Sequence, residues 1–270
     1  MPGASGFGPV SDIVSDGEQV LRSALRGDPA ARAEVARLRA ALTELAEEGN
    51  AKARSLLGGI ALEHDREPAA AFHHFSLAAD QEDPAGRRGL GHLYAKGVGV
   101  EQDLEAAERL FRLAAEGGDA YAKHNLAVIH LDGDSTKERM SPQEVMSLLK
   151  EAAGQGIHQA SAALGDWYAG LDRESDAFSW YMKAAIAGHG PAMFAVAVRF
   201  RDGLGAARNE VQAVRWFLKM LTVGNGDGIH EAIRTARSMS DADIRRAGRM
   251  AGDQSAAETL IRTVRPNSAD

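Results

Sequence analysis

The sequence predicts an all-α protein, a right-handed α-α solenoid of about five helix pairs with capping helices at both ends. Three observations predict this fold. Apolar residues recur three and four positions apart, which is the spacing of one helix face. The same pattern returns several times, about 32 to 38 residues later each time. Aromatic residues make up only 6% of the chain, while alanine and glycine are abundant, which favours close contacts between helices.

The N-terminal 50 residues do not follow this repeat. Residues 1–10 are rich in Gly, Pro and Ser, so we expect a flexible tail there. Residues 12–26 and 29–48 each carry an apolar stripe, and Asp28-Pro29 provides a cap followed by proline at the first helical position. We interpret residues 11–50 as two helices that cap the N-terminal end of the stack.

The clearest helix pair lies within residues 84–119. Gly97-Val98-Gly99 interrupts its helical pattern, because paired glycines favour a tight turn with positive φ. Asp103 is placed to cap the second helix, and Gly117-Gly118 is placed to end it. A single hairpin of this size has too little core to be stable alone, so it predicts neighbouring copies of itself.

Five copies align on an apolar anchor residue that a small residue precedes by four positions. The anchors are Leu57, Leu90, Leu126, Leu164 and Val196. A second small residue follows each anchor directly, which lets a neighbouring helix approach closely. The repeats span residues 51–224 in this alignment. We expect five bulky side chains to be buried between layers: Tyr94, Phe111, Tyr168, Trp180 and Trp216.

The repeat stops after residue 224. Residues 229–237 predict a short helix, Ser240 caps another that runs to about residue 251, and Asp253 starts a last one. We interpret residues 225–264 as C-terminal capping helices and residues 265–270 as a tail. Arginines are dense in this region, but interleaved Asp and Glu favour a solvated outer face over a phosphate or nucleic-acid site.

The second unit follows the motif A-x-x-x-L-G-x-x-Y, then G-x-G-V-x-x-D, then A-x-x-x-(W/Y/F), then A-A-x-x-G. This motif resembles the Sel1-like repeat, a relative of the tetratricopeptide repeat, and residues 90–115 match it almost position for position. The third unit departs from it, because the polar loop LDGDSTKERMSP replaces the glycine turn and ends in the capping box Ser141–Glu144. The first unit has Ala61 in place of the aromatic residue and His64–Pro68 in place of the turn. The resemblance implies an adaptor or regulatory role.

Composition excludes several classes of protein. A formal net charge of −7 argues against a general nucleic-acid binder. No apolar run reaches the length of about 18 residues that a membrane-spanning helix needs, and no signal peptide is recognisable. The absence of cysteine rules out disulfides and fits a cytoplasmic protein, and the preference for Arg over Lys hints at a bacterial source.

The sequence shows little that could carry chemistry, and we expect no catalytic residues, no metal and no cofactor. His73-His74 cannot readily chelate one ion, because adjacent helical residues point about 100° apart. Asp132, Asp134 and Glu138 resemble part of a calcium loop without its closing glutamate. The glycines of residues 97–100 lack the Gly-Lys-Ser/Thr ending of a phosphate loop, so a structural turn is the better interpretation.

The anchor register predicts which residues of the first helices face an inner groove. Positions two before and two after each anchor include Ser55, Gly59 and Ala162, and Leu131 lies one turn further on. The groove residues that we expect to contact a partner are Arg88, His92, Lys96, His124, Val128, Asp166, Phe194, Val198 and Arg201. Cationic or protonatable groups on adjacent layers, with an apolar end, suit an extended acidic segment that carries one hydrophobic residue. A merely solvated inner wall is the alternative.

The predicted function is therefore that of a non-enzymatic scaffold or adaptor that binds a protein or peptide in its concave groove. We expect neither nucleic acid nor membrane as a partner, and the oligomeric state stays open. Two alternatives remain: a structural subunit of a larger or self-associating assembly, and a small-molecule-binding enzyme. The enzyme is less favoured, because the Sel1-like proteins associated with penicillin-type ligands are rich in cysteine and this chain has none.

Overall fold

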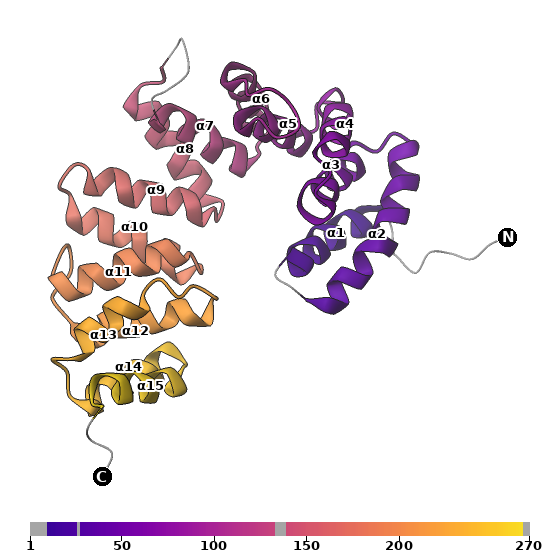
Figure 1. Ribbon diagram of the computed structural model, residues 1–270. Coiled ribbons are helices and arrows are strands. Elements are labelled where there is room, and N and C mark those ends of the chain that lie inside the picture. Colours follow the sequence, from indigo (N-terminus) through magenta and orange to yellow (C-terminus); the bar gives the residue numbers. More distant parts are fainter. Residues whose placement is uncertain (1–9, 26–27, 133–138, 267–270) are drawn as a thin grey trace. The chain divides into compact units, whose positions relative to one another are not determined.

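The computed structural model describes residues 10–25, 28–132 and 139–266. The predicted tails at residues 1–9 and 267–270 lie outside these ranges. The described residues form fifteen α-helices and one π-helical turn, and they contain no strand (Figure 1). The predicted all-α solenoid of helix pairs is thereby confirmed. The chain divides into two compact units, Met1–Leu148 and Leu149–Asp270, which are described in turn.

The first unit opens with the two helices predicted from the N-terminal apolar stripes, α1 (Val10–Leu25) and α2 (Pro29–Glu47). Asp28 caps α2, because its Oδ1 accepts a hydrogen bond from the backbone N–H of Ala30 at 2.9 Å. Both helices bury apolar residues against residues 53–60, which belong to the following helix and the turn after it. This core contains Ile13, Ala24, Val35, Leu38, Leu42, Leu45, Leu57 and Ile60.

Three helix pairs follow α2, each made of a first and a second helix. They are α3 (Ala51–Gly59) with α4 (Pro68–Ala79), α5 (Pro84–Lys96) with α6 (Leu104–Glu116), and α7 (Ala120–Asp132) with α8 (Pro142–Gly154). The last of these helices continues from the first unit into the second. The predicted capping box starts it, since the carboxylate of Glu144 accepts from the backbone N–H of Ser141 at 2.8 Å.

The turn between paired helices needs a residue with positive φ. Gly97 provides it after α5, with φ of 64°, as the sequence predicts. The first pair lacks this glycine, and there α3 continues into a π-helical turn, η1 (Ile60–Asp65). Arg66 follows with φ of 60°, so a non-glycine residue adopts the left-handed conformation that ends the helix.

Within a pair, the small residue after the anchor receives the ring of a bulky residue on the second helix. A Cβ added to Gly91 would lie 2.9 Å from the ring of Phe111. A Cβ on Gly58 would lie 2.6 Å from the ring of Phe75. Real Cβ atoms do not approach other atoms so closely. Glycine is therefore required at these positions, because the two helices are in direct backbone-to-ring contact.

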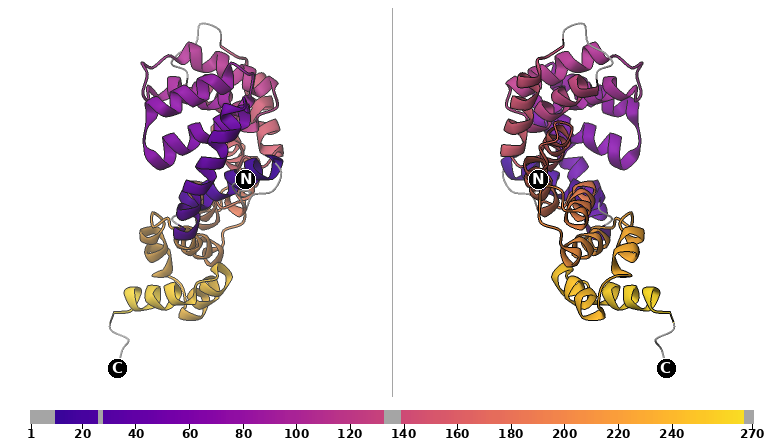
Figure 2. Two further views of the ribbon diagram at one scale, coloured as in Figure 1. Left: turned by 90° about the vertical axis from the view of Figure 1, so that its right-hand side faces the viewer. Right: turned by 90° about the vertical axis from the view of Figure 1, so that its left-hand side faces the viewer.

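The second unit contains the helices α9 (His158–Ala169), α10 (Glu174–Ile186), α11 (Gly190–Asp202), α12 (Glu210–Thr222), α13 (Ile229–Ala236), α14 (Asp241–Ala251) and α15 (Gln254–Val264). The glycine contact recurs here, because a Cβ on Gly165 would lie 2.6 Å from the ring of Tyr181. The predicted caps are confirmed, with Ser240 accepting from the backbone N–H of Asp243 and Asp253 from that of Ala256. Figure 2 shows α14 and α15, in yellow, next to the C-terminus.

Three of the five bulky side chains expected between layers are buried. Phe111 is 2% exposed, Trp216 is 5% exposed and Tyr168 is 7% exposed. The expectation is wrong for Tyr94 and Trp180, which are only half-buried.

Both rings pack in part against other side chains, and the rest of each side chain is accessible to water. Tyr94 lies in the last turns of α5 and meets Phe72 edge to face, with ring centroids 6.0 Å apart. The ring of Trp180 is covered on one face by the ammonium group of Lys183, 3.8 Å from the ring centroid. A cation–π contact of this kind is compatible with exposure to water, so it does not require burial.

The difference in burial predicts a difference in stability. Phe111→Ala should lower the free energy of unfolding by about 3–5 kcal/mol, because a buried ring leaves a cavity. Trp180→Ala should lower it by less, since part of that side chain already contacts water. Chemical denaturation followed by circular dichroism measures both, and equal losses for the two variants would contradict the assignment of burial.

Enlarging a glycine at one of these contacts should also destabilise the chain. Gly91→Ala should destabilise the chain by about 1–3 kcal/mol, because the new methyl group would overlap the ring of Phe111. Gly154→Ala is the matched control, since a Cβ at this helical glycine meets nothing within 4 Å. The control should be neutral or stabilising by up to about 1 kcal/mol. Thermal unfolding of the two variants separates these outcomes.

Candidate partner-binding surface

The helix α5 shows how a first helix divides its two faces. Gly89 and Leu93 are buried against neighbouring helices. His92 and Lys96, which the register predicts to face the groove, are exposed. Exposed and buried residues thus alternate at helical spacing, so one face of α5 is left open for contacts with other molecules.

Arg88, the first cation predicted for the groove, is held by its own chain. Its Nε donates to Oδ2 of Asp119 at 2.9 Å, and its guanidinium group lies 5.3 Å from the ring centroid of Tyr121. The side chain of Arg88 is 34% exposed and that of Asp119 is 12% exposed. Asp119 also caps α7, because its Oδ1 accepts from the backbone N–H of Ala122 at 2.7 Å.

The same arrangement occurs one layer earlier. The hydroxyl group of Ser55 donates to Oδ2 of Asp83 at 2.6 Å, and that oxygen also accepts from the backbone N–H of Gly86 at 2.9 Å. In both cases a residue two before the anchor binds the aspartate that caps the next first helix. We call this arrangement, Ser55 with Asp83 and Arg88 with Asp119, the interlayer latch. Ser55 is consequently buried, and so is Ala162, which corrects their expected place on an open groove wall.

His92 is harder to protonate than an ordinary histidine. Its pKa lies below the ordinary value for histidine, and desolvation by the surrounding protein is the main cause. The carboxylate of Glu63 opposes this effect, while the cations of Lys96 and Arg88 lower the pKa of His92 further. The predicted run of cations on α5 is therefore reduced to Lys96 and the exposed part of Arg88.

The other predicted residue positions of the first unit lie on α7. His124 and Val128 are half-buried, and His124 Nδ1 lies 3.2 Å from Oδ1 of Asn125. Leu131, one turn further on, is 38% exposed. These side chains offer a mixed polar and apolar surface.

The second unit contains the remaining predicted positions. The carboxylate of Asp166 accepts a hydrogen bond from the hydroxyl group of Tyr181 at 2.5 Å. Burial, together with this hydrogen bond, raises the pKa of Tyr181 above its ordinary value. Phe194 meets Phe217 edge to face, with ring centroids 5.6 Å apart, and Val198 is half-buried. Phe194 and Val198 thus keep part of their apolar surface accessible.

Arg201 does not present a free charge. Its guanidinium group pairs with Asp202, with Nε 2.6 Å from Oδ1, and also with Glu231 of α13. The side chain of Arg201 is 19% exposed. These carboxylates raise the pKa of Arg201, and the same pairing with Arg201 lowers the pKa of Asp202. The arrangement joins α11 to the C-terminal helices.

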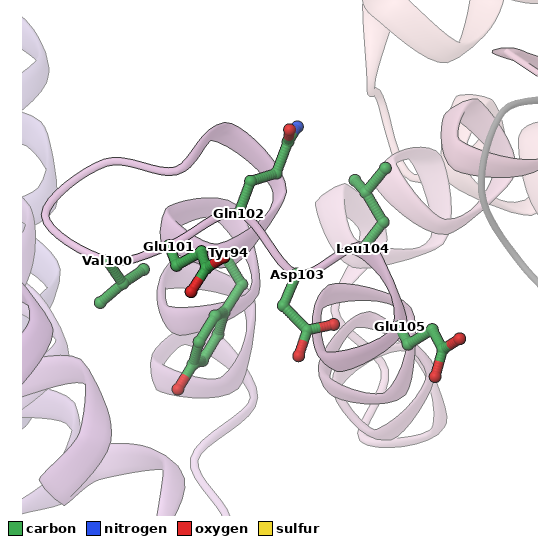
Figure 3. A pocket seen from close by; sticks show the side chains of 7 residues that line it. All are labelled: Tyr94, Val100, Glu101, Gln102, Asp103, Leu104 and Glu105. Carbon is green, nitrogen blue, oxygen red and sulfur yellow. The ribbon is translucent and has the colours of Figure 1, made fainter.

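A hollow beside the turn between α5 and α6 is a feature that the register does not predict. It measures about 610 Å³ and is lined by Tyr94 and residues 100–105. Figure 3 shows Tyr94 beneath the turn and Asp103 and Glu105 to its side, whereas Gln102 and Leu104 point the other way. Acidic residues around Asp103 are visible in the sequence, but the structural role of Asp103 in this turn explains its presence. Asp103 caps α6, accepting from the backbone N–H of Ala106 at 2.8 Å.

Within the described ranges, no three of His, Asp and Glu side chains come together in a way that could hold a metal ion. Asp134 and Glu138 of the incomplete calcium pattern lie outside those ranges. No helix in the described part of the chain combines the length and the apolar character needed to cross a membrane.

The sequence profile of the Sel1 repeat matches five segments, which together cover more than half of the chain: residues 41–83, 84–119, 120–157, 158–189 and 190–225. The first match starts within α2, ten residues before the predicted start of the repeats. A protein of Rattus norvegicus, DAP3-binding cell death enhancer 1, is 31% identical over 169 residues, which are 62% of this chain and 33% of that protein. The Mus musculus protein of the same name has the same identity and coverage. The chain thus spans about a third of the length of these curated relatives.

Two solved structures share the fold. One is c5321, a protective antigen of uropathogenic Escherichia coli strains that displays an SLR fold. It has a TM-score of 0.70 at 25% identity, over 94% of this chain and 57% of that chain. The other is a Sel1 repeat protein from Oxalobacter formigenes, with a TM-score of 0.64 at 20% identity, over 94% of this chain and 99% of that chain.

The interlayer latch predicts that Arg88 has a structural role. Arg88→Ala should lower the free energy of unfolding by about 1–2 kcal/mol, because it removes a charge-assisted hydrogen bond to a largely buried carboxylate. Asp119→Ala should have a larger effect, since the cap of α7 is lost as well. Lys96→Ala, on the exposed face of the same helix, is the control and should change stability by no more than about 0.5 kcal/mol. Denaturant titration measures the free energy of unfolding of all three variants. Unchanged stability of Arg88→Ala would show that the latch does not stabilise the fold.

Proposed function

This chain belongs to the Sel1 repeat family, and from that premise we propose that it is a non-enzymatic scaffold whose first helices hold a protein or peptide partner. Sel1 repeat proteins are generally protein-interaction scaffolds without enzymatic activity. The name of the rat relative states that it binds DAP3, which supports a protein as the kind of partner. The proposed contact residues are those predicted from the register, except that Arg88 and Arg201 are held in ion pairs within the chain.

The observation that carries the proposal is the open face of α5. His92 and Lys96 are exposed there, although the opposite face of the same short helix is fully packed. Side chains that are not needed for packing are available for recognition, and a concave stack of helices is suited to holding an extended chain. Arg88 forms an ion pair with Asp119, and the lowered pKa of His92 makes that side chain harder to protonate. Lys96 therefore supplies the main accessible positive charge on this face of α5.

The partner segment that fits best carries an acidic residue opposite Lys96. The second unit carries its own accessible apolar residues, the half-buried Phe194 and Val198, which form a separate candidate contact for an apolar side chain. A charged contact of this kind acts mainly on the association rate, while a small apolar contact contributes to the lifetime of the complex.

The test begins with recovery of the tagged chain from its native host and identification of co-purified proteins by mass spectrometry. With the partner in hand, Lys96→Glu should slow association and weaken its dependence on salt, because the steering charge is reversed. Lys150→Glu is the matched control, since Lys150 is an exposed lysine on α8, a second helix outside the proposed surface, and the change in net charge is the same. Reversal of Arg88 is less suitable, because it would also break the interlayer latch.

Two results would contradict the proposal. An association rate and salt dependence that Lys96→Glu leaves unchanged would show that the open face of α5 does not bind the partner. Recovery of the chain with no companion other than itself would favour the alternative function, a subunit of a self-associating assembly.

A further inference from the structure

The C-terminal helix α14 has an exposed face that its packing does not explain. Its buried face consists of Ile244, Ala247, Gly248 and Ala251, which lie against neighbouring helices. The packing there is tight, since a Cβ on Gly248 would lie 2.4 Å from the Cβ of Ala257 on α15. The opposite face carries exposed side chains at helical spacing, and we call these the α14 arginine face: Arg245, Arg246, Arg249 and Met250.

The arginine face holds three positive charges, and the acidic residues of the same helix, Asp241 and Asp243, lie in its first turn. Arg245 is paired with Glu258 of α15, with Nε 2.8 Å from Oε1, and both side chains are about half exposed. Arg246 and Arg249 make no ion pair with any residue in the described part of the chain. This concentration of cations lies on a chain whose formal net charge is −7.

Stabilisation of the helix dipole accounts for only part of this arrangement. A cation in the last turn, such as Arg249, interacts favourably with the C-terminal end of a helix. The dipole does not explain why three arginines share one face with Met250, whose side chain is 38% exposed. Arginine and methionine are both enriched at the centres of protein interfaces, because one forms bidentate bonds and the other adapts its shape.

A hollow lies beside this face, between α14 and α15. It measures about 410 Å³ and is lined by Arg245, Arg249, Gln254, Ser255, Ala257 and Glu258. Guanidinium, amide and hydroxyl groups all donate hydrogen bonds, so they are suited to carboxylate oxygens. The one carboxylate in the lining, Glu258, is already paired with Arg245.

We propose that the α14 arginine face is a second interaction surface, which docks an acidic segment of a partner protein and places an apolar side chain of that segment on Met250. This surface is separate from the first helices of the repeats, so the inference goes beyond the proposed function. A protein segment fits better than nucleic acid, because the negative charge of the whole chain opposes the approach of a long polyanion.

The test uses the full chain and a fluorescein-labelled synthetic peptide that repeats Glu-Glu-Asp-Leu, measured by fluorescence anisotropy. The unmodified chain should bind the peptide at low salt and release it as salt rises. Arg246→Glu combined with Arg249→Glu should weaken binding by about tenfold or more, because two attractive contacts become repulsive. Arg246→Gln combined with Arg249→Gln removes the charges without repulsion, and its affinity should lie between the other two.

The matched control is Arg37→Glu combined with Arg109→Glu. These are exposed arginines on α2 and α6, and the change in net charge is the same. The control should keep its affinity within about twofold of the unmodified chain, since distant exposed charges are screened. Equal weakening in the two reversed pairs would mean that total charge governs binding, and it would overturn the proposal.

Two further outcomes would also overturn the proposal. One is the absence of peptide binding at low salt. The other is equal or tighter binding of a single-stranded DNA oligonucleotide that the same α14 reversals abolish. Circular dichroism confirms that each variant is folded, and if the glutamate pair fails to fold, the glutamine pair decides between the outcomes.

Discussion

The direct contact between a glycine backbone and an aromatic ring sets the geometry of the helix pairs. Phe111 against Gly91 and Tyr181 against Gly165 bring two helices closer than any side chain at the glycine would allow. Because the ring fills the space between the paired helices, the first helix buries one face completely. Its other face includes Lys96, which is exposed and therefore available for recognition. The proposed partner surface is thus a consequence of small residues on the opposite side of the helix.

The interlayer latch determines how much charge that surface presents. Arg88 donates its Nε–H to Asp119, and this pairing compensates the largely buried carboxylate of Asp119. Desolvation lowers the pKa of His92, so this side chain is harder to protonate. The accessible positive charge of α5 is therefore concentrated near its C-terminal end. The α14 arginine face differs, because Arg246 and Arg249 form no ion pair within the described part of the chain, and Arg245 pairs with Glu258 at an exposed surface.

Local patterns in the sequence predicted most of the fold. The caps at Asp28, Ser240 and Asp253 and the turn at Gly97 depend on residues only a few positions apart, and all of them are confirmed. The repeat register also identified the small residue that follows each anchor. The departure in the first pair was recognisable from its missing glycine, although a π-helical turn with Arg66 in its place was not foreseen.

The candidate surface was harder to predict, because periodicity indicates which face a residue occupies and not which partner it meets. Arg88 pairs with a residue 31 positions away, and Arg201 pairs with one 30 positions away. No local pattern contains such pairs. The burial of Ser55 and the exposure of Trp180 likewise depend on the neighbouring layer and on Lys183.

The interlayer latch also couples the folding of neighbouring helix pairs. Asp119 starts α7 and at the same time anchors α5, so the beginning of one helix is energetically coupled to the presence of the helix before it. In a linear array, coupling between neighbours decides whether segments melt together or fray one at a time. Loss of a latching aspartate would therefore divide the first unit into separately opening parts. Amide protons of α7 would then exchange with solvent faster than those of α5, although no core residue had changed.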